Sequence, residues 1–238
     1  MKILIANDDG IKSPVLPLLA KWAQKLGDVT VAAPKVEQSG KSQAIQFTHE
    51  IEITKVEITP GIDAYSVDST PADCVRFGIF GLNQTYDLII SGINRGYNLG
   101  DDIVYSGTCA AIFEGSRVGI RGIALSTDAN NLMNAPAALD TVWEYIEKND
   151  LFTHNSLYNV NIPYNPKEVR ITRQGGMYFT DSFVHRGGHL YVQSGEVVKD
   201  SGNDPLTDIN AIRQNSISIT PLVTTRTEMS VFKKLNNL

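Results

Sequence analysis

The chain begins MKILIANDDGI (residues 1–11), and this stretch decides the fold. Its apolar residues 3–6 run without alternation into NDDG, which is typical of a short strand buried on both faces. Open parallel sheets bind ligands at the carboxyl ends of their strands, so we expect Asp8 and Asp9 at that edge. A hard divalent cation such as Mg²⁺ or Mn²⁺ relieves the repulsion between adjacent carboxylates. The alternative is that both aspartates only form a turn and cap the next helix.

Length and composition exclude several classes of protein. A chain of 238 residues can bury a core without disulfides, and Cys74 and Cys109 both fall in expected helices. The net charge of -5 does not favour binding to duplex nucleic acid or to an anionic membrane. No stretch has the length of a membrane span or of a signal-peptide core, so we expect a cytoplasmic protein without a membrane partner.

Strands and helices alternate up to residue 163. Residues 14–26 have helical apolar spacing, and residues 28–34 form a second buried strand, which completes one βαβ unit. Similar patterns predict strands at 64–67, 87–92, 123–126 and 157–162, helices from Pro71 and Ser106, and a helix over 135–148. Residues 50–58 alternate and predict an edge strand. The expected fold is α/β, with a doubly wound, mostly parallel, Rossmann-like sheet.

Beyond Pro163 the apolar period changes to two. Residues 169–172 and 189–193 alternate and are separated by glycine pairs, which predicts β-hairpins projecting from the core. We therefore divide the chain into a catalytic core, 1–163, and a region 164–238. The second region would hold the hairpin arm, a helical turn at 207–212, a strand at 216–222 and a helix at 227–235. An isolated hairpin is marginally stable, so we expect a homodimer or homotetramer.

Two further loops bring polar groups to the edge that carries the acidic pair. The segment KVEQSGKSQAI (35–45) contains Ser39, and the loop after strand 87–92 contains two asparagines, Asn94 and Asn98. Ser106-Gly107-Thr108 opens a helix, where free backbone N–H groups, two hydroxyls and the helix dipole favour a phosphate. Ser and Thr also cap many ordinary helices, so the prediction of phosphate binding depends on the position of this turn at the same edge as the acidic pair.

The sequence resembles the SurE family, the survival-protein-E nucleotidases. The matching blocks are ILIANDDGI (3–11), EQSGKSQAI (37–45), STPADCVRFG (69–78), DLIISGINRGYNLGDDIVYSGT (87–108), TDINA (207–211) and SISITPL (216–222). The resemblance implies a metal-dependent phosphomonoesterase that hydrolyses nucleoside monophosphates. The sequence leaves open whether 5'-monophosphates, 3'-monophosphates or short polyphosphate are preferred. It implies metal-ligand positions, which here are Asp8, Asp9, Ser39 and Asn94. It also implies phosphate-holding positions, which here are Asn98, Ser106, Gly107 and Thr108.

The residue types agree with that chemistry. Two carboxylates, a hydroxyl and an amide carbonyl form an oxygen shell for one Mg²⁺ or Mn²⁺ per subunit and leave positions for water and substrate. The hypothesis is in-line attack on phosphorus by a water that the metal activates, with Asp8 or Asp9 steering the water. Either aspartate fits this role.

Rival functions and sites are less consistent with the sequence. A Mg²⁺-binding receiver module also ends its first strand in an acidic pair, but it needs a third aspartate at the end of a later strand. Here Asp87 starts the strand, which ends in Ser91-Gly92. A Rossmann nucleotide-binding protein would show Gly-x-Gly-x-x-Gly after the first strand, which is absent. His185 and His189 flank a glycine turn, so a zinc pair is not expected.

Overall fold

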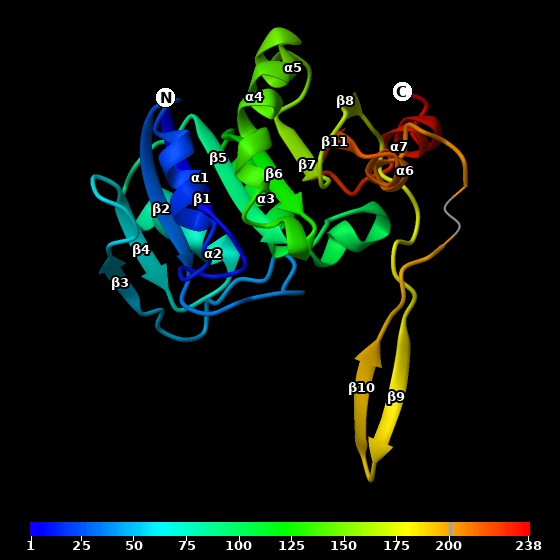
Figure 1. The fold of residues 1–238 in the computed structure, drawn as a ribbon, viewed down its shortest axis with the longest axis horizontal. Coiled ribbons are helices and arrows are strands. Elements are labelled where there is room, and N and C mark those ends of the chain that lie inside the picture. Colours follow the sequence, from blue (N-terminus) through cyan, green and yellow to red (C-terminus); the bar gives the residue numbers. More distant parts are fainter. Residues whose placement is uncertain (200–201) are drawn as a thin grey trace.

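Strand β1 (Lys2–Ala6) lies in the interior of the main sheet. The computed structural model describes residues 1–199 and 202–238, and in these ranges it has a nine-stranded sheet and a separate two-stranded one (Figure 1). In sheet order the main strands are β3 (Ile53–Val56), β4 (Asp63–Val67), β2 (Asp28–Pro34), β1, β5 (Leu88–Arg95), β6 (Arg121–Thr127), β7 (Leu157–Ile162), β11 (Ser216–Pro221) and β8 (Glu168–Ile171). The expected doubly wound sheet is confirmed.

The strand order reverses between β1 and β5. The strands β4, β2, β1, β5, β6 and β7 are parallel, whereas β3 and β11 run antiparallel to their neighbours β4 and β7. The chain first adds β2 on one side of β1 and later adds β5 on the other side. Such a switch point in a parallel sheet leaves a crevice at the carboxyl ends of the two strands. Asp8 and Asp9 follow β1 at this point.

Helices cover both faces of the sheet. In β1, Ile3 and Ile5 belong to a core that includes α1 (Leu16–Ala23) and α4 (Leu139–Lys148). Leu4 and Ala6 belong to a second core, with α2 (Pro71–Arg76) and α3 (Gly107–Ser116). The first strand is therefore buried on both faces, as its unbroken apolar run predicts.

Short helical segments complete the body of the molecule. They are η1 (Phe77–Gly81), η2 (Gly100–Tyr105), η3 (Ala129–Asn131), η4 (Ala135–Ala138) and α5 (Leu151–His154). The helix expected over 135–148 is divided: η4, which contains Pro136, is a 3₁₀ turn, and α4 follows it. Across the first core, the ring centroids of Trp22 in α1 and Trp143 in α4 lie 6.4 Å apart in an edge-to-face contact.

The region after residue 163 differs in part from expectation. Residues 169–172 were expected in a hairpin, but β8 instead pairs in parallel with β11 at the edge of the main sheet. An edge strand and a hairpin strand share the same alternation, so the pattern alone could not separate them. The projecting hairpin consists of β9 (Ser182–Gly187) and β10 (Leu190–Ser194), which extend away from the body in Figure 1.

Two helices follow the hairpin. Thr207 caps α6 (Asp208–Arg213), which packs on β11, and every residue of the last helix, α7 (Met229–Leu235), is exposed. The division of the chain at residue 163 stays a prediction, although β11 and β8 extend the core sheet. Among the described residues, no helix is long and apolar enough to cross a membrane.

Candidate active site

Asp8 is the buried centre of the site. Its side chain follows β1, only 4% of the residue is exposed, and the hydroxyl of Thr108 donates to its Oδ1 at 2.7 Å. Burial raises the pKa of Asp8 to about 6; the charge of Asp9 adds to this effect, and the hydrogen bond from Thr108 opposes it. A buried carboxylate that is costly to ionise gains most from a nearby cation.

Gly107 allows the helix to approach this carboxylate. A Cβ at Gly107 would lie 3.0 Å from the Cβ of Asp8, 3.2 Å from its Oδ2 and 3.0 Å from the Cγ of Pro71. Nearly any side chain would therefore push the start of α3 away from the acid. The absent side chain brings the positive end of the helix next to the acidic pair.

Ser106 shapes the same turn of α3. Its backbone is extended (φ −70°, ψ 119°), and its Oγ accepts a hydrogen bond from the N–H of Cys109 at 3.1 Å. This is an ordinary N-cap, as expected for a serine before a helix. Of the two hydroxyls predicted to hold phosphate, Ser106 thus caps the helix and Thr108 bonds to Asp8.

Asp9 connects the ends of the two strands at the switch point. Its Oδ2 accepts the backbone N–H of Arg95, the last residue of β5, at 3.0 Å. Burial raises the pKa of Asp9, the bond from Arg95 opposes the rise, and the charge of Glu37 adds to it. Asp9 is consequently hydrogen-bonded to the residue that directly follows Asn94.

Asn94 lies where β5 departs from regular pairing. The register with β6 shifts between Ser91 and Asn94, after which Asn94 pairs with Ser126. The side-chain Nδ2 of Asn94 donates to the carbonyl of Gly96 at 2.8 Å. Because the amide nitrogen is bonded in this way, the oxygen is the end of the side chain suited to a cation.

Ser39 lies on the loop that joins β2 to β3. The N–H of Gln38 donates to the backbone carbonyl of Asp8 at 2.8 Å, and the N–H of Ser42 donates to that of Tyr105 at 3.0 Å. These bonds attach the loop to the rim on both sides of Ser39. Its hydroxyl donates to Oε1 of Glu37 at 2.6 Å. Glu37 was missed in the sequence, although it stands two residues away in the block EQSGKSQAI.

Asn98 is buried and bonded to β6 and β7. Its Nδ2 donates to the Oγ of Ser126 at 2.7 Å, and its backbone bonds to the side chains of Asn159 and Asn161. These three partners were also missed. The sequence signal of Asn159 and Asn161 is weak, because LYNVNI (157–162) is indistinguishable from an ordinary alternating strand.

The donor set fits a hard divalent cation. Carboxylate, hydroxyl and amide oxygens suit Mg²⁺ or Mn²⁺ and not a soft metal. Within residues 1–199 and 202–238, no group of three or more His, Cys, Asp and Glu residues could form a metal site. Any metal here would therefore depend on the two aspartates together with neutral oxygens. Cys109, next to Thr108, is a buried free thiol whose pKa burial raises to about 12.

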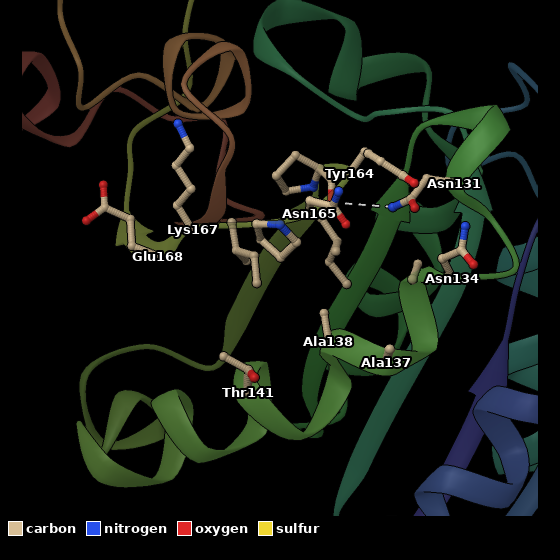
Figure 2. Close-up of a pocket in the computed structure, with 14 residues that line it drawn as sticks. Asn131, Asn134, Ala137, Ala138, Thr141, Tyr164, Asn165, Lys167 and Glu168 are labelled. Atoms are coloured by element: carbon tan, nitrogen blue, oxygen red, sulfur yellow. Dashed lines mark hydrogen bonds between the residues drawn. The ribbon is translucent and has the colours of Figure 1, made fainter.

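A separate cavity of about 380 Å³ lies on the α4 side of the sheet (Figure 2). It is bounded by η4, the start of α4 and the turn at 163–167, and Asn131 donates to the carbonyl of Pro163 at its wall. None of the predicted site residues lines it, and its lining has neither a carboxylate pair nor a helix start that faces an acid. The rim between β1, β5 and α3 remains the candidate active site.

The family model described as "Survival protein SurE" matches residues 3–181. The chain belongs to the SurE family. The 5'-nucleotidase SurE of Thermosipho africanus is 36% identical over 246 residues, which cover 99% of this chain and 96% of the relative. The 5'-nucleotidase SurE of Legionella pneumophila is 34% identical, and the match covers 100% of this chain and 97% of the relative.

A solved structure shares the SurE fold. The crystal structure of the SurE protein from Aquifex aeolicus matches with a TM-score of 0.83 at 30% sequence identity. The match covers 100% of this chain and 99% of that chain. It therefore includes the hairpin and the segments after it as well as the part that the family model matches.

Proposed function

We propose that this SurE family member is a divalent-metal-dependent phosphomonoesterase that hydrolyses nucleoside 5'-monophosphates to nucleoside and phosphate. The observation that carries the proposal is the hydrogen bond from Thr108 to Asp8, which joins the start of α3 to the acidic pair at the switch point. A bound cation and backbone N–H donors both stabilise a phosphate group, and this arrangement supplies ligands for the cation next to the donors of a helix start. The names of the relatives, 5'-nucleotidase SurE, agree with it.

Four oxygen-bearing residues would hold one Mg²⁺ or Mn²⁺: Asp8, Asp9, Ser39 and Asn94. When bound, the ion neutralises phosphoryl charge and makes a coordinated water more acidic. The carboxylate of Asp8 or of Asp9 would orient the attacking water opposite the leaving oxygen. Burial raises the pKa of Asp8 to about 6, so a proton competes with a cation for this side chain below that pH.

The start of α3 would bind the phosphoryl group. The first N–H groups of a helix lack intrahelical partners and point along its axis, with the dipole adding positive potential. Gly107 brings these groups close to Asp8, and the hydroxyl of Thr108 connects the start of α3 to the acidic pair. Asn98 and Ser106 complete the proposed phosphate cradle.

The receiver-like alternative lacks its acceptor residue. The strand β5 ends in Asn94 and Arg95, and neither can form an acyl phosphate. Incubation with acetyl phosphate should therefore give hydrolysis without a stable phosphoprotein. A stable acyl phosphate would favour the receiver.

A homodimer or homotetramer is proposed from the exposed apolar surface. On the hairpin, Phe183 and Leu190 are each 70% exposed, and on α7 Phe232 and Leu235 are also exposed. A two-stranded hairpin without a partner surface is marginally stable. Burial of these side chains on a second copy of the chain would remove the cost of their exposure. The cytoplasmic location stays a prediction.

The function is tested with purified protein and a panel of 5'- and 3'-nucleoside monophosphates, simple phosphate esters and short polyphosphate. Each substrate is assayed with Mg²⁺, with Mn²⁺ and with EDTA, and released phosphate is measured. The expected result is metal-dependent release of phosphate, fastest from a nucleoside 5'-monophosphate and abolished by EDTA. Equal rates with EDTA, or no release from any nucleotide, would refute the proposal.

A further inference from the structure

Side chains of two neighbouring strands hold the residue Asn98 in the loop between β5 and η2. Its N–H donates to Oδ1 of Asn161 at 2.9 Å, and its carbonyl accepts from Nδ2 of Asn159 at 2.8 Å and of Asn161 at 2.9 Å. Its own Nδ2 donates to the Oγ of Ser126 at 2.7 Å. Both backbone polar groups of Asn98 thus bond to β7, and its side chain bonds to β6.

The contact with Asn161 fixes the direction of Asn98 as well as its position. The amide oxygen accepts and the amide nitrogen donates, so only one orientation of the Asn161 amide satisfies both bonds. A two-point contact of this kind restrains rotation, which a single hydrogen bond does not. The amide of Asn159 adds a third bond to the same carbonyl group.

Packing alone does not explain these two asparagines. Both are 0% exposed, and they lie two residues apart on one face of β7, the face toward α3, where the Sγ of Cys109 donates to Oδ1 of Asn159 at 3.7 Å. A buried amide costs about 1–3 kcal/mol unless it is hydrogen-bonded, whereas an apolar side chain would pack without this cost. The amides bond mainly to the backbone of one loop residue, so their role concerns that loop.

The strand register connects these residues to the candidate metal site. Asn94 pairs with Ser126 across β5 and β6, and Ser126 pairs with Asn161 across β6 and β7. A row of three polar side chains therefore runs across three strands from a proposed metal ligand to the residue that holds Asn98. Asn98 lies over this row, at the carboxyl end of the sheet.

We propose that Asn159 and Asn161 are positioning residues that hold Asn98 in the direction required to bind the substrate phosphate. This inference rests on the proposed function. The Nδ2 of Asn98 carries two hydrogens, and Ser126 accepts one of them. The anchored backbone keeps the second hydrogen directed at the phosphoryl group, and fixed donors of this kind bind phosphate without a cost of reorganisation.

The first test is Asn161→Asp, which has nearly the same shape. An aspartate can accept the N–H of Asn98 but cannot donate to its carbonyl while ionised. We expect the inhibition constant of inorganic phosphate and the KM for a nucleoside 5'-monophosphate to rise about tenfold, as for one lost hydrogen bond. The Mn²⁺ concentration for half-maximal activity should change less than about twofold. Asn159→Asp should act in the same direction but more weakly, because Asn161 still bonds both backbone groups.

Asn155→Asp is the matched control. The Nδ2 of Asn155 also bonds to backbone groups: it donates to the carbonyls of Leu157 at 2.7 Å and Leu222 at 2.9 Å. These bonds lie at the opposite end of β7 from Asn161. We expect this variant to lower the melting temperature and to leave the inhibition constant of phosphate unchanged. Equal weakening of phosphate binding by both variants at equal loss of melting temperature would overturn the proposal.

A double-mutant cycle tests whether Asn161 acts through Asn98. Asn98→Ala alone and Asn98→Ala combined with Asn161→Asp should give phosphate inhibition constants within about twofold of each other, because the second change has no partner left to misplace. Losses that multiply would overturn the proposal. Should Asn161→Asp fail to fold, Asn159→Asp replaces it: threefold or greater weakening of phosphate binding supports the proposal, and no change overturns it.

Phosphate binding to the unaltered protein separates the two proposals. It is measured by titration calorimetry with inorganic phosphate in the presence of Mn²⁺. A protein that binds phosphate with the expected variant pattern but hydrolyses no nucleotide contradicts the proposed function only. A protein that hydrolyses nucleotides while Asn161→Asp leaves phosphate binding unchanged contradicts the positioning role only. A protein that binds no phosphate contradicts both.

Discussion

Gly107→Ala should reduce activity more than stability. Gly107 is the first residue of α3, so alanine gains there at most the roughly 0.8–1.0 kcal/mol by which it is favoured over glycine in a helix interior. Overpacking a well-packed site costs about 1–3 kcal/mol. The new Cβ would lie 3.0 Å from the Cβ of Asp8 and 3.0 Å from the Cγ of Pro71, so one of them must move by a few tenths of an ångström. The free energy of unfolding should fall by roughly 0–2 kcal/mol as the net of the two effects.

The displacement acts directly on the catalytic geometry. A misplacement of about 1 Å can cost a hundredfold in rate, so a smaller shift between α3 and Asp8 should lower kcat/KM about 10- to 100-fold. That loss corresponds to about 1.4–2.7 kcal/mol of transition-state stabilisation. The assay is steady-state release of phosphate from a nucleoside 5'-monophosphate at saturating Mn²⁺, with unfolding in urea measured on the same preparation.

Gly115→Ala is the control in the same helix. Its Cβ would lie 1.9 Å from the Cδ1 of Ile89, at the far end of α3 from the acidic pair. We expect this variant to lose about 1–3 kcal/mol of stability, with kcat/KM of the folded protein changed only a few-fold. Wild-type kcat/KM in Gly107→Ala, or an equal loss in Gly115→Ala, would refute the reasoning.

Three further predictions concern carboxylates. Asp8→Asn should abolish metal-dependent hydrolysis and raise the melting temperature in EDTA. Because burial raises the pKa of Asp8 to about 6, ionisation of Asp8 destabilises the metal-free fold as the pH rises from about 4 to 6, and the amide removes this cost. A lower melting temperature would contradict this prediction. The affinity for Mn²⁺, measured by calorimetry from pH 5 to 7, should fall up to tenfold per pH unit below about 6 as protons compete for Asp8, and a constant affinity would exclude this role. Asp208→Asn should lower the free energy of unfolding in urea by about 1–3 kcal/mol. Both carboxylate oxygens accept backbone N–H groups, from Gly100 at 2.9 Å and Gly175 at 2.8 Å, so the amide NH₂ would face one of these donors, and we expect this loss to exceed the relief of the burial that raises the pKa of Asp208. Unchanged or higher stability would mean that burial of the charge outweighs these bonds.

Local sequence patterns predicted the sheet and the position of the acidic pair beside the start of α3. The apolar run at 3–6 followed by NDDG was sufficient to place Asp8 and Asp9 at a strand end, because a doubly buried strand has few other places to end. The small Ser-Gly-Thr turn predicted the start of α3 next to them. These inferences depend only on periodicity and on the geometry of parallel sheets.

Contacts between distant segments were beyond the reach of such patterns. Asn161 lies 63 residues from Asn98, and Asp208 lies 108 residues from Gly100, the residue whose N–H it accepts. Periodicity reports which face of an element is buried, but it does not identify the partner across the fold. For the same reason the alternation in residues 169–172 predicted a strand correctly but not its neighbour, β11.

The insertion of β11 between β7 and β8 determines when the protein can finish folding during its synthesis. Glu168 in β8 pairs with Ser216 in β11, so β8 has no neighbour in the sheet until the chain has been extended beyond that residue. At about 5–20 residues per second, ribosomes need roughly 2–10 s for this stretch. In that interval the hydrogen-bonding edge of β7 is open and can pair with other nascent chains. A stop codon shortly before residue 216 should therefore yield aggregates and not a smaller working enzyme.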